Sequence, residues 1–144
     1  MYIFLISQEK KVWAKRCEFF KQYIKHRKNK PSVEWRSGKK QYYFDGDEYF
    51  ITKEGCFVLE KDYQNSFAIN FKGTLPSIIY PNGTKEWWAN RKLHRNNGPA
   101  IEYSNGDKEW WWNGKRHNYQ NPAVIIGNKQ YFFEYGEFLK CIIK

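Results

Sequence analysis

Two stretches of the sequence decide the fold: residues 76–95 (PSIIYPNGTKEWWANRKLHR) and residues 99–118 (PAIEYSNGDKEWWWNGKRHN). A shift of 23 positions superposes the proline, the tyrosine, the Asn-Gly pair, the Lys-Glu-Trp-Trp run and the histidine of the first stretch on those of the second. Self-similarity at a fixed spacing is the sequence signature of a repeat architecture. The sequence therefore predicts structural repeats with a period of about 23 residues.

Further copies lie on both sides of these two. Residues 31–47 (PSVEWRSGKKQYYFDGD) align with residues 99–115 without a gap. A fourth copy begins at Pro122, loses two residues at its turn and continues through the aromatic run that starts at Tyr131. Residues 47–75 fill the gap with a degenerate copy whose hairpin signal is Lys53-Glu54-Gly55. We expect repeats throughout residues 31–144.

Each repeat is predicted to be a β-hairpin, because aromatic and β-branched runs flank an Asn-Gly turn. The sequence Tyr80-Pro81-Asn82-Gly83 fits a type I turn followed by a left-handed glycine, which makes a three-residue loop. Such a loop sets Glu102 opposite Lys108, whereas a two-residue loop would set it opposite Glu109. The same register places a small residue opposite a large ring in three repeats: Ser32 with Tyr42, Ser77 with Trp87, and Ala100 with Trp110. Second turns are expected at Asp45-Gly46 and Asn113-Gly114.

The N-terminal segment, residues 1–30, has a different pattern. Met1–Ile6 is a continuous apolar run and is expected to form a short buried strand. From Gln8 to Lys28, apolar residues recur at helical spacing, Ser7 suits an N-cap, and Pro31 follows as a stop signal. We therefore expect one amphipathic helix here.

Basic residues are concentrated in this segment. The chain has a formal charge of +10, and residues 1–30 hold nine basic side chains against two acidic ones. Six of them are candidates for binding nucleic acid, an anionic membrane surface or an acidic protein: Lys10, Lys11, Lys15, Arg16, Lys21 and Lys25. The competing interpretation is that the lysines only solvate the outer face of the helix.

The predicted fold is mainly β: an antiparallel meander of stacked hairpin repeats over residues 31–144, with the strand and helix of residues 1–30 packed on them. A length of 144 residues suits one domain. Aromatic residues make up 20% of the chain, which argues against intrinsic disorder. The sequence has no apolar stretch long enough for a transmembrane helix, and Met1–Ile6 is too short for a signal peptide, so we expect a protein that is not secreted. The three cysteines (Cys17, Cys56, Cys141) are expected to be reduced thiols in the cytoplasm.

Two histidines, His94 and His117, occupy equivalent positions in neighbouring repeats. Two ligands fall short of the three or four that zinc needs, so each is expected to be a structural imidazole bonded to a loop carbonyl. His26 lies in the predicted helix and is expected to be solvated. The sequence contains no nucleophile elbow and no phosphate-binding glycine loop. We expect no catalytic residue, no metal and no cofactor.

The tryptophans are the candidate partner-binding residues: Trp87, Trp88, Trp110, Trp111 and Trp112. Neighbouring side chains on a strand point to opposite faces, so one face of this run must be core. The other face is either covered by packing or presents a ladder of rings about 10 Å apart to a partner. The sequence leaves both alternatives open.

The pattern Gly-x-Lys-x-Trp-Trp-x-Asn-x-Lys-x-His-Arg-x-x-Gly-Pro-Ala over Gly83–Ala100 resembles the variant MORN repeats of many bacterial, phage and giant-virus proteins. The second copy, Gly106–Ala123, departs from it at Asn118 and Asn121, and the outer copies match only its hairpin half. The resemblance implies a stack of hairpins that serves as an interaction or structural surface. It carries over no catalytic residue.

These observations lead to one expected function and two alternatives. We expect a non-enzymatic MORN-like β-repeat protein that works by protein–protein contact, as a minor structural or assembly component of a virus, located in the host cytoplasm or the virion. One alternative is a nucleic-acid-associated factor that uses the basic N-terminal helix for non-specific contact. The other is an antitoxin-type binding partner.

Overall fold

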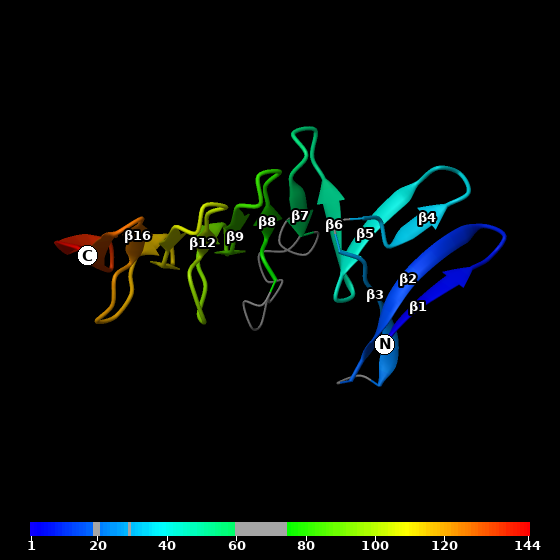
Figure 1. Ribbon diagram of the computed structural model, residues 1–144, viewed down its shortest axis with the longest axis horizontal. Coiled ribbons are helices and arrows are strands. Elements are labelled where there is room, and N and C mark those ends of the chain that lie inside the picture. Colours follow the sequence, from blue (N-terminus) through cyan, green and yellow to red (C-terminus); the bar gives the residue numbers. More distant parts are fainter. Residues whose placement is uncertain (19–20, 29, 60–74) are drawn as a thin grey trace. The chain divides into compact units, whose positions relative to one another are not determined.

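The computed structural model describes residues 1–18, 21–28, 30–59 and 75–144. The chain divides into two compact units. The first consists mainly of Met1–Ile51, and the second of Thr52–Val58 and the described part of Asp62–Lys144. Every regular element in the described ranges is a β-strand, as Figure 1 shows, and none of these residues forms a helix that could cross a membrane.

The first unit is a sheet of six strands. They are β1 (Tyr2–Ile6), β2 (Lys10–Cys17), β3 (Gln22–Lys25), β4 (Val33–Trp35), β5 (Lys40–Phe44) and β6 (Asp47–Ile51). The order is β1-β2-β4-β5-β6, and β3 pairs with the second half of β2. All of these pairings are antiparallel.

The expected N-terminal helix is wrong. The strand expected before it is confirmed as β1, but it lies at a sheet edge and four of its five residues are exposed, so its expected burial is wrong. Ser7 is not a helix N-cap but begins a hairpin turn, in which its N–H donates to Lys10 O at 2.9 Å. Beyond that turn, β2 pairs with β1 from Lys11 opposite Ile6 to Lys15 opposite Tyr2. A strand needs hydrogen-bonding partners for its main chain, and a helix next to β1 would supply none. Residues 10–17 therefore form a strand that pairs with β1, even though their apolar residues recur at helical spacing.

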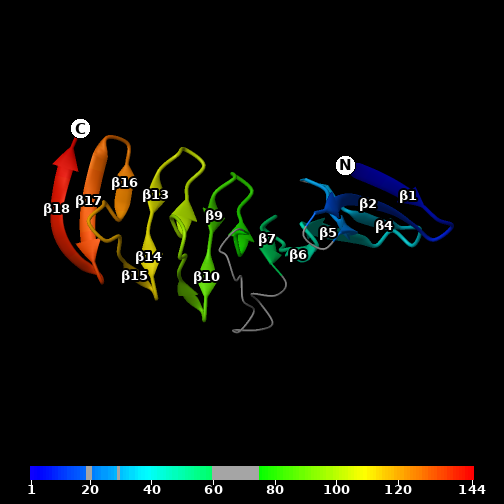
Figure 2. The same cartoon turned by 90° about the horizontal axis from the view of Figure 1, so that it is seen from below.

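The second unit is a meander of short strands. They are β7 (Phe57–Leu59), β8 (Ile78–Ile79), β9 (Lys85–Glu86), β10 (Trp88–Ala89), β11 (Lys92–Leu93), β12 (Ile101–Glu102), β13 (Lys108–Glu109), β14 (Trp111–Trp112), β15 (Lys115–Arg116), β16 (Val124–Ile126), β17 (Lys129–Glu134) and β18 (Glu137–Ile143). The main sheet has the order β7-β8-β9-β12-β13-β16-β17-β18, and β10–β11 and β14–β15 are separate two-stranded arms. Figure 2 shows these hairpins following one another through the second unit.

The predicted register and loop are confirmed. Glu102 lies opposite Lys108, and the Tyr103 N–H donates to Asp107 O across a three-residue loop. The third residue of that loop, Gly106, has a φ of 96°, which an L side chain rarely adopts. The loop of the fourth copy is shorter, as expected, but by one residue and not by two, since Ile126 lies opposite Lys129 across a two-residue loop. The degenerate copy keeps its turn at Gly55, and its remainder from residue 60 to 74 lies outside the described residues.

Small residues opposite large rings form the centre of each repeat. Ser32, Ser77, Ala100 and Ala123 are all at most 2% exposed. The Ser77 hydroxyl donates to Trp88 O and accepts from the Trp88 N–H, and Ser32 does the same with Tyr43. A hydroxyl or a methyl group therefore fits the small space at these positions, and a larger side chain would disrupt the packing of the repeat.

The second turn of each repeat is also confirmed. Asp45-Gly46 joins β5 to β6, and Asn113-Gly114 joins β14 to β15. Both residues of each pair have positive φ, as a type I′ turn requires. The turn at Asn113-Gly114 brings the chain back into the segment that carries His117, whereas the segment after Asp45-Gly46 has Tyr49 at the equivalent position.

Candidate interaction surface and the contacts that join the repeats

Histidine side chains link each repeat to the next. His94 Nδ1 accepts the N–H of Asn113 at 3.0 Å, and its ring lies 4.5 Å from that of Trp112. His117 Nδ1 accepts the N–H of Tyr135 at 3.1 Å, and its ring stacks on the Tyr135 ring at 4.1 Å. In both cases the donor is the first residue of the following type I′ turn. The imidazoles are structural, as predicted, but they bond to a loop N–H rather than to a loop carbonyl.

His26 makes the same link in the first unit. Its Nδ1 accepts the N–H of Asp45 at 3.1 Å, and its ring lies 4.5 Å from that of Phe44. The side chain is only 7% exposed, so the expectation of a solvated histidine is wrong. The first unit therefore contains a further repeat that begins in β2.

A sequence signal for this further repeat exists and was missed. His26-Arg27 precedes Pro31 by the same spacing with which His94-Arg95 precedes Pro99 and His117-Asn118 precedes Pro122. The equivalent tryptophan, Trp13, lies 13 positions before its histidine, whereas Trp87 lies seven before His94. An insertion of six residues hides the match from any search at a fixed spacing.

An arginine stacks on the indole at the start of two of these repeats. The guanidinium of Arg95 lies 3.8 Å from the ring of Trp87, and its Nη1 donates to Pro99 O at 3.1 Å. Arg27 has the same two distances to Trp13 and to Pro31 O. In the copy that begins at Pro99, where the sequence departs from the pattern, Asn118 Nδ2 donates to Pro122 O at 2.9 Å. The shorter amide thus keeps the loop contact and gives up the ring contact.

A second inter-repeat link lies at the opposite end of the hairpins. Thr84 Oγ1 accepts the N–H of Ser104, and the equivalent residue Asp107 accepts the N–H of Gly127 through Oδ1 at 2.9 Å. The copies that begin at Pro76 and Pro99 are therefore each joined to the next copy at both of their turns. The histidine, arginine and turn contacts between repeats explain most of the residues that recur every 23 positions.

A buried carboxylate, Glu109, organises the copy that begins at Pro99. Glu109 is 5% exposed and accepts from Arg116 Nη2 at 2.9 Å and from the Tyr103 hydroxyl at 3.0 Å. Burial, then the hydrogen bond to Glu109, raises the pKa of Tyr103 to about 12. In the preceding copy burial and Glu86 likewise raise the pKa of Tyr80 to about 12. Both phenols are therefore protonated donors at neutral pH.

The pKa of His26 is lowered from its usual value. Burial is the largest cause, and the charge of Lys15 is the next, while Asp45 acts in the opposite direction. Lys15 also forms an ion pair with Asp45. A lowered pKa favours the neutral imidazole, which is the form that can accept the Asp45 N–H.

The five tryptophans do not form one open ladder. Trp87 is 4% exposed, Trp88, Trp110 and Trp111 are half-buried, and only Trp112 is 41% exposed. Most of these tryptophans are therefore wholly or partly buried by packing within the repeats. The helix that was expected to cover them is not present among the described residues.

Two of the exposed rings of the second unit, Trp112 and Tyr135, lie along one of its edges. Trp112 lies next to one type I′ turn, and Tyr135, which is 62% exposed, lies in the next such turn. Each is backed by a histidine of the preceding repeat. Figure 2 shows the corresponding ends of β14 and β17 on the same side of this unit. We call Trp112 and Tyr135, with His94 and His117 behind them, the ring ridge.

The basic residues of the N-terminal segment do not share one face. On β2, Lys11 and Lys15 point to one side of the sheet, and Lys10 and Arg16 to the other. Lys10 lies 4.5 Å from the Trp35 ring, and Lys25 lies 4.5 Å from the Tyr43 ring. Arg16 and Lys21 each pair with Glu18. The strand thus disperses the charges that a helix would have gathered.

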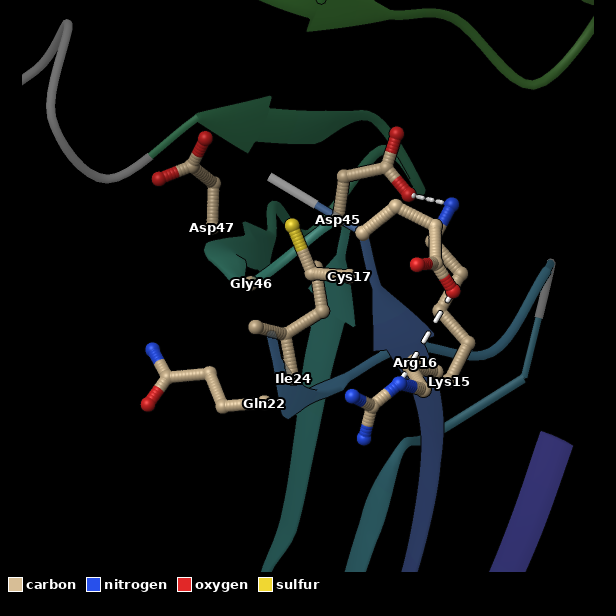
Figure 3. A pocket seen from close by; sticks show the side chains of 9 residues that line it. Lys15, Arg16, Cys17, Gln22, Ile24, Asp45, Gly46 and Asp47 are labelled. Atoms are coloured by element: carbon tan, nitrogen blue, oxygen red, sulfur yellow. Dashed lines mark ion pairs between the residues drawn. The ribbon is translucent and has the colours of Figure 1, made fainter. Parts of the chain in front are cut away.

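A cavity of about 540 Å³ lies beside the elongated β2–β3 hairpin of the first unit. Figure 3 shows side chains that line it: Arg16, Cys17 and Gln22 come from this hairpin, and Asp45 and Asp47 come from the β5–β6 hairpin. Its charged groups of both signs pair largely with one another, as Lys15 does with Asp45. No sequence pattern pointed to this cavity.

Within the described ranges, no three His, Cys, Asp or Glu side chains form a group that could hold a metal ion. Comparisons of the chain with protein-family models, with curated proteins and with solved structures give no match.

Proposed function

We propose that this chain is a non-enzymatic β-repeat protein that binds another protein through the ring ridge. The observation that carries the proposal is the contrast between buried and exposed rings in the second unit. Trp87 is in the core, whereas Trp112 and Tyr135 are exposed at successive turns. Contacts of the recurring histidines, of the arginines and of the hairpin turns join the repeats to one another. The exposed rings of the ring ridge therefore remain available to a partner.

The ring ridge has the properties of a protein-binding surface. Aromatic side chains are enriched at such surfaces because they bury a large apolar area and lose few rotatable bonds. The histidine behind each ring holds it in place, which reduces the entropy lost on binding. The rings are about one repeat apart, roughly 10 Å, so an extended segment with apolar side chains would fit them best.

The resemblance of Gly83–Ala123 to variant MORN repeats supports this proposal, since it implies an interaction or structural surface. A place in a larger assembly such as a virion is the form of that role which we expect. The nucleic-acid alternative has less support, because β2 divides its basic residues between two faces. The antitoxin-type alternative is a special case of binding another protein.

Affinity purification from the native source tests the proposal. The tagged chain is compared with a Trp112→Ala/Tyr135→Ala variant, and with Tyr23→Ala as a control whose ring is also 41% exposed but lies in the first unit. We expect a partner protein with the unchanged chain and the control, and at least a tenfold loss with the double variant. Equal recovery by the double variant, or no partner with any form, would refute the proposal. Salt-sensitive recovery of nucleic acid alone would favour the alternative.

A further inference from the structure

Strand β18 is an exposed sheet edge. Among the described residues it pairs only with β17, and all seven of its residues are exposed. Four of these residues are large and apolar: Phe138, Leu139, Ile142 and Ile143. An edge strand of this length presents main-chain groups to which another strand can add.

Main-chain directions identify which groups are available on this edge. The Lys144 N–H donates to Asn128 O at 2.9 Å, so the main chain of Lys144 is directed toward β17. Because directions alternate along a strand, Cys141 and Ile143 direct their N–H and C=O groups away from β17. A partner strand must therefore place its own outward-directed residues opposite these two.

We propose that a second copy of this chain pairs antiparallel with β18, with Cys141 opposite Cys141 on the two-fold axis. Lys140 then lies opposite Ile142 of the other copy. A bulge between Lys140 and Phe138 leaves one extra residue in each strand, so Glu137 comes opposite Lys144. The interface is isologous, and it does not depend on the ring ridge.

The charged residues of β18 favour this register, and they favour a second copy of the chain as the partner strand. Because outward residues must face one another, the nearest alternative registers differ by two positions. One would place Lys140 opposite Lys140, and the other would place Lys140 opposite Lys144, both of which are destabilising. Within its own chain Glu137 lies opposite Glu134, so Lys144 of a second copy would give it an opposite charge. Strand β1 also has exposed apolar residues, but it has no charged residue to select a register.

Native cysteines report directly on the register. Residues paired in this way have their Cα atoms about 5.5 Å apart, within the range of a disulfide. Mild oxidation with diamide, which takes up the two thiol hydrogens, should give a covalent dimer. We expect the Cys17→Ser/Cys56→Ser variant to retain this dimer and the Cys141→Ser variant to lose it. Crosslinking that is independent of Cys141 would overturn the proposed register.

A charge exchange tests the interface without covalent chemistry. Light scattering after size exclusion should show a concentration-dependent dimer, whose dissociation constant rises about tenfold in Glu137→Lys. Adding Lys144→Glu should restore it. Ile142→Lys, which faces Lys140, should also dissociate the dimer, whereas Ile126→Lys is a control of similar exposure outside the interface.

Three results would refute the pairing. They are a monomer at every concentration, no effect of Glu137→Lys, and a dimer that is lost on Leu5→Lys in β1 but not on Ile142→Lys. Far-UV circular dichroism of each variant separates a lost interface from a lost fold.

Discussion

The repeat that begins at Trp13 and the repeat that begins at Trp87 make the same contacts over different lengths of chain. In both, an arginine stacks on the indole at 3.8 Å, and a histidine accepts a turn N–H of the next repeat. Between tryptophan and histidine, β10 and β11 form two residue pairs, whereas β2 and β3 form four. The contacts therefore define the repeat, and the length of the arm between them does not.

The two copies also differ in how deeply their indoles are buried. Trp87 is 4% exposed, while Trp13 is half-buried next to Phe4 of the N-terminal edge strand. An equivalent residue thus has a different energetic weight in an outer repeat and in an inner one, as expected where each repeat packs only on its neighbours.

The largest effect is expected from removing the inner indole. Trp87→Ala should lower the free energy of unfolding by about 3–5 kcal/mol, because it leaves a cavity under Arg95. Trp13→Ala should cost less, since part of that ring is already in water. Urea titrations followed by circular dichroism measure both changes. A larger loss for Trp13→Ala than for Trp87→Ala would contradict the comparison.

The sequence predicts the regular repeats of the second unit well and the N-terminal repeat poorly. The 23-residue period predicts the turn at Gly106, the register of Glu102 with Lys108 and the small residues under the rings, because these depend on contacts within one hairpin. The N-terminal repeat was not predicted, because a six-residue insertion breaks the period and the apolar spacing imitates a helix. Burial of Trp87 against exposure of Trp112 depends on neighbouring repeats, which no local pattern records.

The next effect is the pH dependence of stability that His26 contributes. The pKa of His26 is lowered in the folded state, so the unfolded chain binds the proton first as the pH falls. Stability from this group is fully present above its ordinary pKa of about 6.5 and is lost as the pH falls toward the folded value.

Urea midpoints between pH 8 and pH 5 measure this dependence. The unchanged protein should become less stable toward pH 5, and His26→Gln should be less stable at pH 8 but show a flatter profile. His94→Gln is the matched control and should keep the slope due to His26. A midpoint that rises as the pH falls would rule out the assignment.

A smaller change in stability is expected from substitutions in the turns of two neighbouring arms, β10–β11 and β14–β15. Asn90-Arg91 and Asn113-Gly114 occupy equivalent positions, but Arg91 has a φ of 61°, where a side chain is strained. Arg91→Gly should therefore stabilise the protein by about 0.5–1 kcal/mol after the entropy lost by glycine. Gly114→Ala should destabilise it by a similar amount, since its φ is 78° and the nearest atoms, of Lys92, leave room for a methyl group. Thermal unfolding checks both signs, and equal signs would contradict the argument.

The smallest effect is expected from converting the long arm into a short one. Replacing residues 16–23 by Asn-Gly leaves Lys15 opposite Ile24 at the turn, as Ala89 lies opposite Lys92. The cavity lined by Arg16 and Cys17 would be lost, but the histidine link would not. Because loop length changes stability only slowly, the free energy of unfolding should change by less than about 1 kcal/mol. Amide exchange at Asp45 should remain slow, since its N–H still donates to His26. Fast exchange at Asp45 in a folded variant would show that the long arm, and not the shared contacts, holds this repeat in place.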